Sequence, residues 1–300
     1  MAADRLLSSR FEMKYMITEP QALHVREFVR SYLELDEYGV GKPNFAYAVH
    51  SLYLDSDDLI LYWRTINGEK NRYKLRIRFY NDNPDIPVFF EVKRRHNNCI
   101  IKHRAALDRA WLPLVIAGQM PPLSAFTSQN PRHELALSEF LRLAESIDCK
   151  PKAHVAYFRE AYLPPDDNSA RVTMDRAVRI EPQFTSRLST HMDDPTFVWP
   201  GVVVLELKFT DRFPLWFREM VEALELTQCS AAKYVAGIEL VGEHRFSSGC
   251  RMRNSMLAEN LALGFSPSTQ LLPNPNTPGL KPEPVAACDL TSQSNPIYSP

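Results

Sequence analysis

The sequence predicts an α+β domain in which eight antiparallel strands form a β-tunnel with helices at the edges of the sheet. Eight segments have the short, alternating apolar pattern of strands. Four longer segments have the spacing of amphipathic helices. Several of the strand patterns also carry Lys, Arg and Glu on one face and large apolar residues on the other, which is typical of a sheet with two different faces.

The elements follow one another closely along the chain. A strand at 10–17 leads to Thr18-Glu19-Pro20, an N-cap with acid and proline that predicts a helix over 19–35. Strands at 47–55, 72–80, 87–95 and 98–107 precede a helix over 132–147. Strands at 153–162, 171–180 and 202–210 come next, followed by helices over 214–226 and 231–240.

These elements predict one domain over 1–241, because no long Gly/Ser linker and no fixed-period repeat interrupts them. Residues 242–265 are expected to be a linker or a short helix. Residues 266–300 hold eight prolines among small polar residues and little apolar material to bury. We therefore expect that tail to be disordered.

Composition restricts the function. The 300 residues are 45% hydrophobic, enough to bury a core, and 35 basic against 36 acidic residues give a net charge of -1. This balance argues against a nucleic-acid or membrane-surface binder, so any anion site must be local. Five separated cysteines with no CxxC pair, no apolar leader and no long apolar run favour a cytoplasmic protein.

The strand over 73–79 places Lys74, Arg76 and Arg78 on one face and apolar residues on the other. Alone, such a strand is more often an exposed surface strand. An acid and a base two residues apart recur, however, in three other strand patterns, which are Glu12-Met13-Lys14, Glu91-Val92-Lys93 and Glu206-Leu207-Lys208. The recurrence favours a shared role for the charged faces.

The residues around these charges are strongly apolar, as in 202–205 and 88–90, which is typical of central strands. If the sheet closes with its apolar face outward, the charges point inward and must be paired or hold a ligand. The inward-facing bases would be Lys14, Lys74, Arg76, Arg78, Lys93, Arg95, Lys102, Arg104, Arg171 and Lys208. The inward-facing acids would be Glu12, Glu91, Asp175 and Glu206.

A surplus of bases in a confined space predicts a multiply charged anion, and a linear phosphate chain suits a tunnel. The fewer carboxylates predict a Mg²⁺ or Mn²⁺ site that phosphate oxygens complete. Glu206 is the first candidate metal ligand, followed by Glu12 and Glu91. Arg95, Lys102 and Arg104 could instead face solvent on a hairpin near residues 97–98.

Other residue types give weaker signals. The eight histidines form no HxH or HxxxH pair, so we expect structural or surface roles for them. Tyr53, Tyr62 and Trp63 are expected in the core or on the outside of the barrel. The acidic run over 55–58 is expected to end a strand and cap a helix.

Eight motifs in order resemble the catalytic domain of the vacuolar transporter chaperone (VTC) family, a branch of the triphosphate tunnel metalloenzymes or CYTH superfamily. The resemblance runs from about residue 10 to residue 240. The motifs are FEMKY, SLYLDSDDLILY, YKLRIRFY, FFEVKRRHNN, AYFREAY, RVTMD, VVVLELKF and SAAKY.

The resemblance implies an eight-stranded tunnel that holds triphosphate or polyphosphate, and transfer of the ATP γ-phosphate to a growing polyphosphate chain. It implies Glu206 as metal ligand and a set of phosphate ligands, namely Lys14, Arg76, Arg78, Lys93, Arg159, Arg171, Lys208 and Lys233. With Lys74 and Arg95 these form the predicted phosphate site, in which Lys14, Arg76, Arg78, Lys93 and Lys208 are the expected catalytic residues.

Two departures from the family are visible. Ser230 stands where the eukaryotic polymerases have another lysine. We also find no SPX-like helical sensor before the tunnel and no membrane helices, so we expect a separate membrane protein as partner if the polymer is to be translocated.

The leading hypothesis is a cytoplasmic, Mn²⁺- or Mg²⁺-dependent polyphosphate polymerase that uses ATP and needs no protein nucleophile. Its partners would be ATP and polyphosphate or triphosphate, with no nucleic acid, and its oligomeric state stays open. A triphosphatase that hydrolyses triphosphate-bearing substrates is the first alternative. A non-catalytic polyphosphate or nucleotide sensor is the second.

Overall fold

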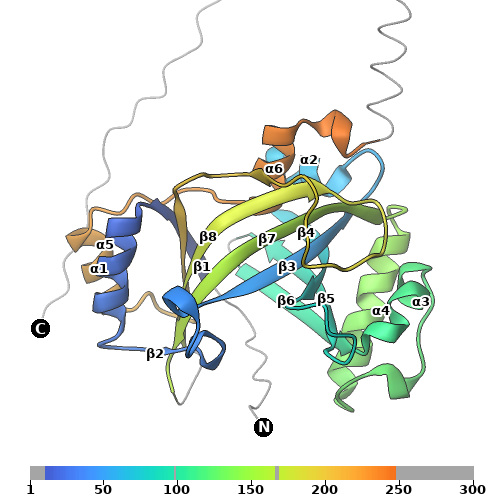
Figure 1. Cartoon of the computed structure of the whole chain (residues 1–300), viewed down its shortest axis with the longest axis horizontal. Helices are drawn as coiled ribbons and strands as arrows, with labels where there is room; N and C mark the ends of the chain where they lie inside the picture. The colour runs from blue at the N-terminus through green and yellow to red at the C-terminus, as the bar shows by residue number, and fades with distance from the viewer. Residues whose placement is uncertain (1–10, 98, 166–168, 248–300) are drawn as a thin grey trace, which may run out of the picture. The chain divides into compact units, whose positions relative to one another are not determined.

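A computed structural model of the chain describes residues 11–97, 99–165 and 169–247. The strands are β1 (Phe11–Ile17), β2 (Glu34–Leu35), β3 (Ala46–Asp55), β4 (Asn71–Phe79), β5 (Val88–His96), β6 (Cys99–Leu107), β7 (Lys150–Leu163), β8 (Ala170–Pro182), β9 (Thr196–Phe197) and β10 (Val203–Phe209). The α-helices are α1 (Glu19–Val29), α2 (Ile60–Ile66), α3 (Leu112–Ile116), α4 (Pro131–Glu145), α5 (Leu215–Ala223) and α6 (Lys233–Val241) (Figure 1).

One antiparallel sheet carries the fold. Its eight main strands lie in the order β1-β10-β8-β7-β3-β4-β5-β6. The two short strands lie off this path, where β2 pairs with β7 and β9 pairs with β8. These are the eight strands that the sequence predicts, and the two additional strands have only two residues each. The α+β class and the antiparallel sheet are therefore confirmed.

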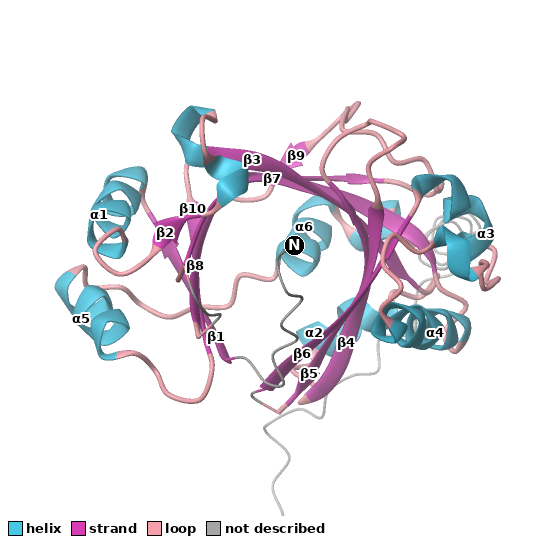
Figure 2. Cartoon of the chain, turned by 90° about the horizontal axis from the view of Figure 1, so that it is seen from below, coloured by secondary structure: helices cyan, strands magenta, loops and turns pink. Residues whose placement is uncertain are grey.

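The predicted closure of the sheet is not found as a backbone ladder. Among the described residues, β1 and β6 are the two edges, and no hydrogen-bonded strand pairing joins them. The curved sheet nevertheless brings these edges toward each other (Figure 2). The Lys93 ammonium of β5 donates to the Glu12 carboxylate of β1 at 2.9 Å, so side chains connect the two ends of the sheet.

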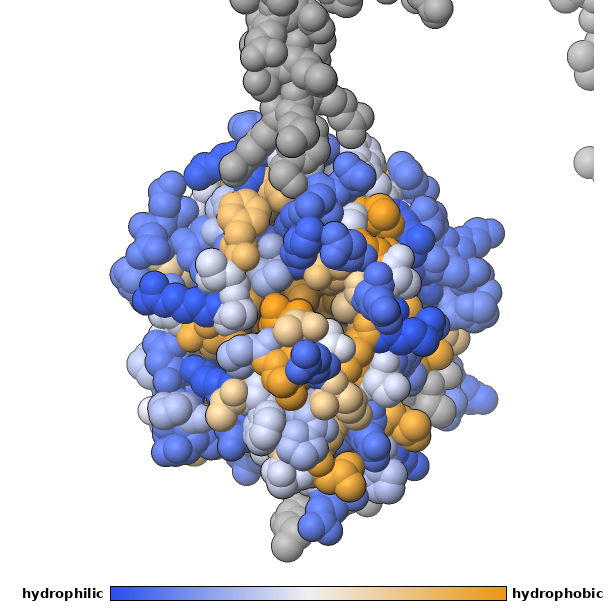
Figure 3. Space-filling model, turned by 90° about the vertical axis from the view of Figure 1, so that its right-hand side faces the viewer, coloured by the Kyte–Doolittle hydropathy of each residue, from blue (hydrophilic) through white to orange (hydrophobic). Residues whose placement is uncertain are grey.

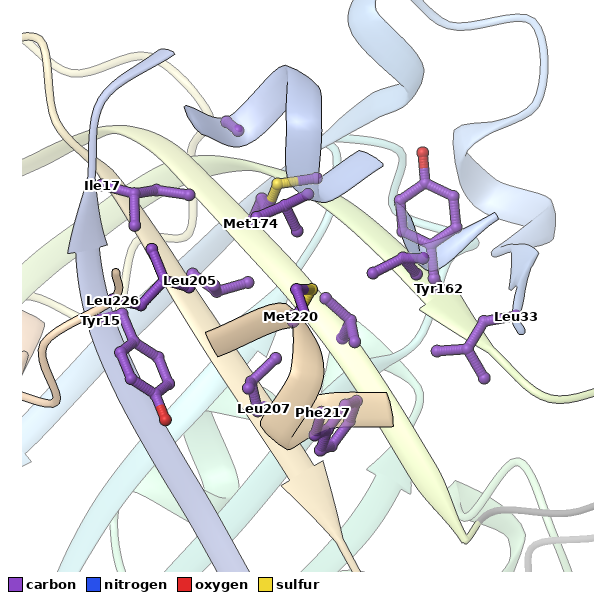
Figure 4. Packing of buried hydrophobic residues seen from close by; sticks show 14 of the residues in the cluster. Tyr15, Ile17, Leu33, Tyr162, Met174, Leu205, Leu207, Phe217, Met220 and Leu226 are labelled. Atoms are coloured by element: carbon purple, nitrogen blue, oxygen red, sulfur yellow. The ribbon is translucent and has the colours of Figure 1, made fainter. Parts of the chain in front are cut away.

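Helices cover the outer face of the sheet at two places. The first apolar cluster joins β1, β10 and β8 to α1 and α5, and there Leu207 packs near Phe217 and Met220 (Figure 4). The second joins β4, β5 and β6 to α3 and α4 and includes Leu75 and Ile77, both fully buried. Each such side chain contributes about 1.5–3 kcal/mol by leaving water.

The third cluster lies inside the curve of the sheet. Tyr234 and Ile238 of α6 pack there against inward-facing residues of β3, β7 and β8, together with Tyr62 of α2. Figure 2 shows α6 enclosed by the strands. This helix therefore fills part of the interior and brings Lys233 to the space that remains.

Some boundaries differ from the sequence prediction. The helix expected over 19–35 ends at Val29, because the chain then turns, buries Leu33 and pairs Glu34 and Leu35 with the end of β7. The expected helix cap after Asp55 is present and begins α2. The tail over 266–300 and the part of the expected linker after residue 247 lie outside the described residues.

The surface of the described part is mostly polar. On the face in Figure 3, hydrophilic side chains surround smaller groups of apolar ones. Across 11–97, 99–165 and 169–247, no helix combines the length and the apolar character that crossing a membrane would need.

Candidate functional site

A cavity of about 810 Å³ lies within the curve of the sheet. Its walls come from inward-facing residues of β1, β3, β4, β5, β6, β7, β8 and β10 and from the segment 228–233. Fourteen of the lining residues are Lys or Arg, and two are Glu. The lining bases are Lys14, Arg72, Lys74, Arg76, Arg78, Lys93, Arg94, Arg95, Lys102, Arg104, Arg159, Arg171, Lys208 and Lys233.

The strand alternation places these charges inside. In β4, Lys74, Arg76 and Arg78 line the cavity, while the intervening Leu75 and Ile77 are buried in the outer cluster beside α4. Because the apolar side is fixed by helix packing, the charged side has no route to the outer surface. All ten predicted phosphate ligands, including Arg95, line the same cavity.

Arg78 is the most buried of the lining arginines, with 6% of its surface exposed. Its Nη2 donates to the Tyr157 hydroxyl at 3.0 Å, and its Nε is buried without a hydrogen-bond partner among the described residues. Arg76 beside it differs, because it is paired with Glu91 at 2.7 Å. A buried guanidinium without a carboxylate partner is costly, so Arg78 is suited to receive an anion.

Glu206 of β10 lies among bases. It contacts Lys208 at 2.6 Å, Lys233 at 3.0 Å and Arg159 at 3.5 Å. Burial alone would raise the pKa of this carboxyl, but the cations, Lys208 and Lys233 foremost, hold its pKa well below the usual range. Glu206 is therefore ionised at neutral pH. Burial lowers the pKa of Lys208 to about 8, although the neighbouring Glu206 carboxylate acts to raise it.

Glu12 of β1 lies close to this group. Its carboxylate contacts Lys93 at 2.9 Å and Lys14 at 3.2 Å, and the same Lys14 ammonium is 3.6 Å from Glu206. Burial opposes ionisation of Glu12, yet Lys93 and Lys14 hold its pKa far below the usual range. Two ionised carboxylates thus flank one ammonium group.

These two carboxylates fit a hard divalent cation. Within the described residues no group of three His, Cys, Asp or Glu side chains is placed to hold a metal ion by itself. Mg²⁺ in proteins commonly binds one or two carboxylates and completes its shell with substrate phosphate oxygens and water. Glu12 and Glu206 supply that donor set, so a metal here would depend on a bound phosphate.

Glu91, the third predicted metal ligand, lies in a separate group. It is fully buried and contacts Arg76 and Lys102 at 2.7 Å and Arg104 at 3.3 Å. Burial is outweighed by Lys102, Arg78 and Arg76, which hold the pKa of Glu91 well below its usual range. Its contacts position the bases of β4 and β6, and it shares none of them with Glu12 or Glu206.

Asp175 of β8 organises the far wall and was predicted only as an inward-facing acid. It holds Arg159 at 2.7 Å and Lys233 at 2.7 Å. Arg159 and Lys233, two predicted phosphate ligands, are therefore held in position by a buried carboxylate that the site prediction did not include. Lys14 is fixed differently, since its ammonium donates to the Ala231 carbonyl at 3.0 Å.

Lys74 has no ion-pair partner within the described residues. Its ammonium group is instead repelled by four neighbouring cations, which are Lys14, Lys93, Arg72 and Arg76. Burial and these cations lower its pKa well below the usual range. Arg171, by contrast, donates to Asp36 at 2.7 Å near the start of β3. Ser230 also lines the cavity.

Aromatic hydroxyls complete the wall and were not predicted. Tyr47, Tyr53, Tyr80 and Tyr157 line the cavity, and Tyr53 accepts from Arg76 at 3.1 Å. Tyr53 is a buried member of the third apolar cluster, as expected of a core residue, and β3 also turns its hydroxyl toward the cavity. The sequence signal for this direction was that Tyr53 lies two residues before Asp55, on the same face of an alternating strand.

Comparison with known proteins adds the family. The sequence matches the family model described as the VTC domain over residues 9–241. No curated protein matches. Among solved structures, a candidate adenylate cyclase from Bacillus halodurans is similar, with 11% identity, a TM-score of 0.44 and coverage of 74% of this chain and 93% of that one.

Proposed function

The chain belongs to the VTC domain family, and from this premise we propose that it is a metal-dependent polyphosphate polymerase that uses ATP. The observation that supports the proposal most is the surplus of cations around the cavity, where Arg78 and Lys74 have no carboxylate partner among the described residues. A polyanion would supply the missing charge along the whole cavity. The proposed setting is the cytosol.

In the proposed reaction, a terminal oxygen of the phosphate chain attacks the γ-phosphorus of ATP. A new P–O–P bond forms, the bond to the β-phosphate oxygen breaks, and ADP leaves with the electron pair. No protein side chain becomes covalently modified. Phosphoryl transfer needs reactants in line and neutralised charge on the transferring oxygens, and fixed bases can meet both needs.

The chain's own residues divide this work. Arg78 and Lys74 are free to bind phosphate oxygens, whereas Arg76 and Arg159 are held in place by Glu91 and Asp175. Lys14, Lys93 and Lys208 surround the proposed metal ligands. Glu206 and Glu12 would hold Mn²⁺ or Mg²⁺, which would neutralise further charge on the phosphates.

The test is to incubate the full chain with ATP and Mn²⁺ and to count ADP, free phosphate and polymer separately after gel resolution. Polymer ladders matched by ADP support the polymerase. Free phosphate without polymer would replace it with a triphosphatase. Tight binding of ATP without turnover would replace it with a sensor.

A further inference from the structure

The row of basic residues on the cavity face of β4 continues to Lys70, the residue just before the strand begins. Every second residue from 70 to 78 is basic, which gives the row Lys70, Arg72, Lys74, Arg76 and Arg78. An extended chain of this length spans about 27 Å, far more than three linked phosphates need. Within this row only Arg76 has an ion-pair partner among the described residues, which is Glu91.

A second cavity of about 490 Å³ lies at the outer end of this row. Gly68, Lys70, Arg72, Arg95 and Asn97 line it, and we call it the outer basic pocket. Arg72 and Arg95 also line the main cavity. The two cavities therefore share part of their walls, and basic side chains continue from one into the other.

Backbone carbonyl groups orient the arginine side chains of the outer basic pocket but do not neutralise their charge. Arg95 Nε donates to the Asn97 carbonyl at 2.8 Å, and Arg72 donates to the Glu69 carbonyl. The Asn97 amide in turn donates to the Lys70 carbonyl at 3.0 Å, which ties the two sides of the pocket together. Burial and the neighbouring Arg95 lower the pKa of Arg72.

The nearest carboxylates on these segments are engaged elsewhere. Glu69 lies 3.8 Å from Arg64, and Glu139 of α4 contacts Arg94 at 2.7 Å. Glu69 also acts on Arg72 electrostatically, but within the described residues neither Arg72 nor Arg95 has a carboxylate at ion-pair distance. That arrangement fits a phosphate oxygen as the missing partner, because guanidinium forks match it.

We propose that the outer basic pocket binds the part of a phosphate chain that extends beyond the main cavity, so that the protein prefers polyphosphate to triphosphate. The inference rests on the proposed function and deepens it. The bases of the main cavity suffice for a triphosphate, whereas Lys70, which lines the outer basic pocket alone, gains a ligand only when the chain is longer. A free phosphate ion is the other source of the same chemistry.

The test compares binding of tripolyphosphate, inorganic phosphate and a polyphosphate of several tens of units by calorimetry at fixed ionic strength. The variant is Lys70→Ala in the full chain, because Lys70 lines the outer basic pocket and not the main cavity. The matched control is Lys42→Ala, which removes one exposed Lys that lines neither cavity. Circular dichroism checks that each variant folds.

The proposal predicts that Lys70→Ala loses about fivefold more affinity for the long chain than for tripolyphosphate, while the control loses none. Equal losses for both probes would overturn it by placing triphosphate in the outer pocket. Loss of phosphate-ion binding alone would overturn it in favour of a simple anion site, and no loss would overturn it outright. Absence of ATP turnover in the unaltered protein, with these binding differences intact, would instead contradict the proposed function.

Discussion

At the scale of single residues, Arg76 and Arg78 have the same side chain on the same strand but different surroundings. Arg76 is compensated by Glu91 at 2.7 Å, whereas Arg78 donates only to the Tyr157 hydroxyl among the described groups. Glu91 acts on Arg78 electrostatically but without contact, so Arg78 is less fully compensated than Arg76. Such a buried cation costs stability in the absence of ligand and yields binding energy in its presence. The two arginines should therefore respond to substitution in opposite ways.

We expect Arg78→Met to weaken tripolyphosphate binding by about 1.5–3 kcal/mol, because a charged hydrogen bond is lost. The free energy of unfolding without phosphate should stay equal or rise, since an apolar side chain of similar length replaces an unpaired charge. Arg76→Met is the matched control and should lower it by about 1–3 kcal/mol, because Glu91 loses a partner. Calorimetry and urea unfolding measure both quantities, and the same stability loss in both variants would contradict the assignment.

Glu206 has the reverse character, an acid that several bases surround. Glu206→Gln should abolish metal-dependent turnover and lower the free energy of unfolding by about 3 kcal/mol, because Lys208 is left with no carboxylate contact. Added polyphosphate should restore part of that stability. Glu139→Gln, outside the cavity, serves as control. Full turnover in Glu206→Gln would remove this residue from the metal site.

At the scale of elements, Asp55 connects β3 to two helices. Its buried carboxylate accepts from the backbone amides of Leu61 and Tyr62 in α2 and from the Tyr234 hydroxyl of α6 at 2.9 Å. Because α6 carries Lys233 to the cavity, this junction positions part of the site. Lys233 at the start of α6 adds ion pairs to Asp175 of β8 and Glu206 of β10.

Asp55→Ala should lower the free energy of unfolding by about 3 kcal/mol or more, because it leaves two buried helix amides without acceptors. Tyr234→Phe removes a single hydrogen bond and should cost only about 1 kcal/mol. Thermal or urea unfolding of both variants provides the comparison. Equal costs would show that the helix caps contribute little.

A second junction, between β3 and β7, predicts acid sensitivity. His50 and His154 are buried with ring nitrogens 3.0 Å apart, and burial lowers their pKa values to about 4 and about 3. Glu181 and Arg179 of β8 also face this pair. Because the unfolded chain binds protons near pH 6.5 and the folded chain does not, stability is complete above that pH and declines below it.

Between pH 7 and pH 5, one such histidine should reduce the free energy of unfolding by about 2 kcal/mol. His154→Gln keeps a polar group without a basic nitrogen and should flatten the decline over this range. Urea unfolding at several pH values tests this directly. An unchanged slope in the variant would mean that other groups cause the acid sensitivity.

How far the elements could be predicted depends on the range of the interaction that fixes them. The inward direction of Lys74, Arg76 and Arg78 follows from a period of two and one apolar face, both visible in the sequence. The pairing of Arg159 with Asp175 depends on the register of β7 and β8, which shifts at Ala156 to Phe158. The sequence holds no local sign of that shift. Likewise, α2 has only seven residues and begins after Leu59, which is in the left-handed region; its first amides are capped by Asp55 and Ser56, several residues earlier, and not by Leu59 itself.

At the scale of the whole described structure, the sheet encloses a cavity without a continuous backbone ladder. Glu12 of the edge strand β1 pairs with Lys93 of β5, the neighbour of the other edge strand β6, and both charges also belong to the proposed site. Apolar clusters on both outer flanks hold the strands around a cavity with fourteen basic residues in its wall. Core packing therefore sustains a concentration of like charge that would otherwise oppose folding.

The most direct test of this account is thermal or urea unfolding of the full chain in the presence of increasing tripolyphosphate, with sulfate at matched ionic strength as reference. The account predicts a progressive gain in the free energy of unfolding that reaches about 2.7 kcal/mol at a hundred times the dissociation constant. Sulfate should give much less, and Arg78→Met should need more ligand for the same gain. No gain with tripolyphosphate, or an equal gain with sulfate, would contradict the claim that the cavity holds a chain of phosphates.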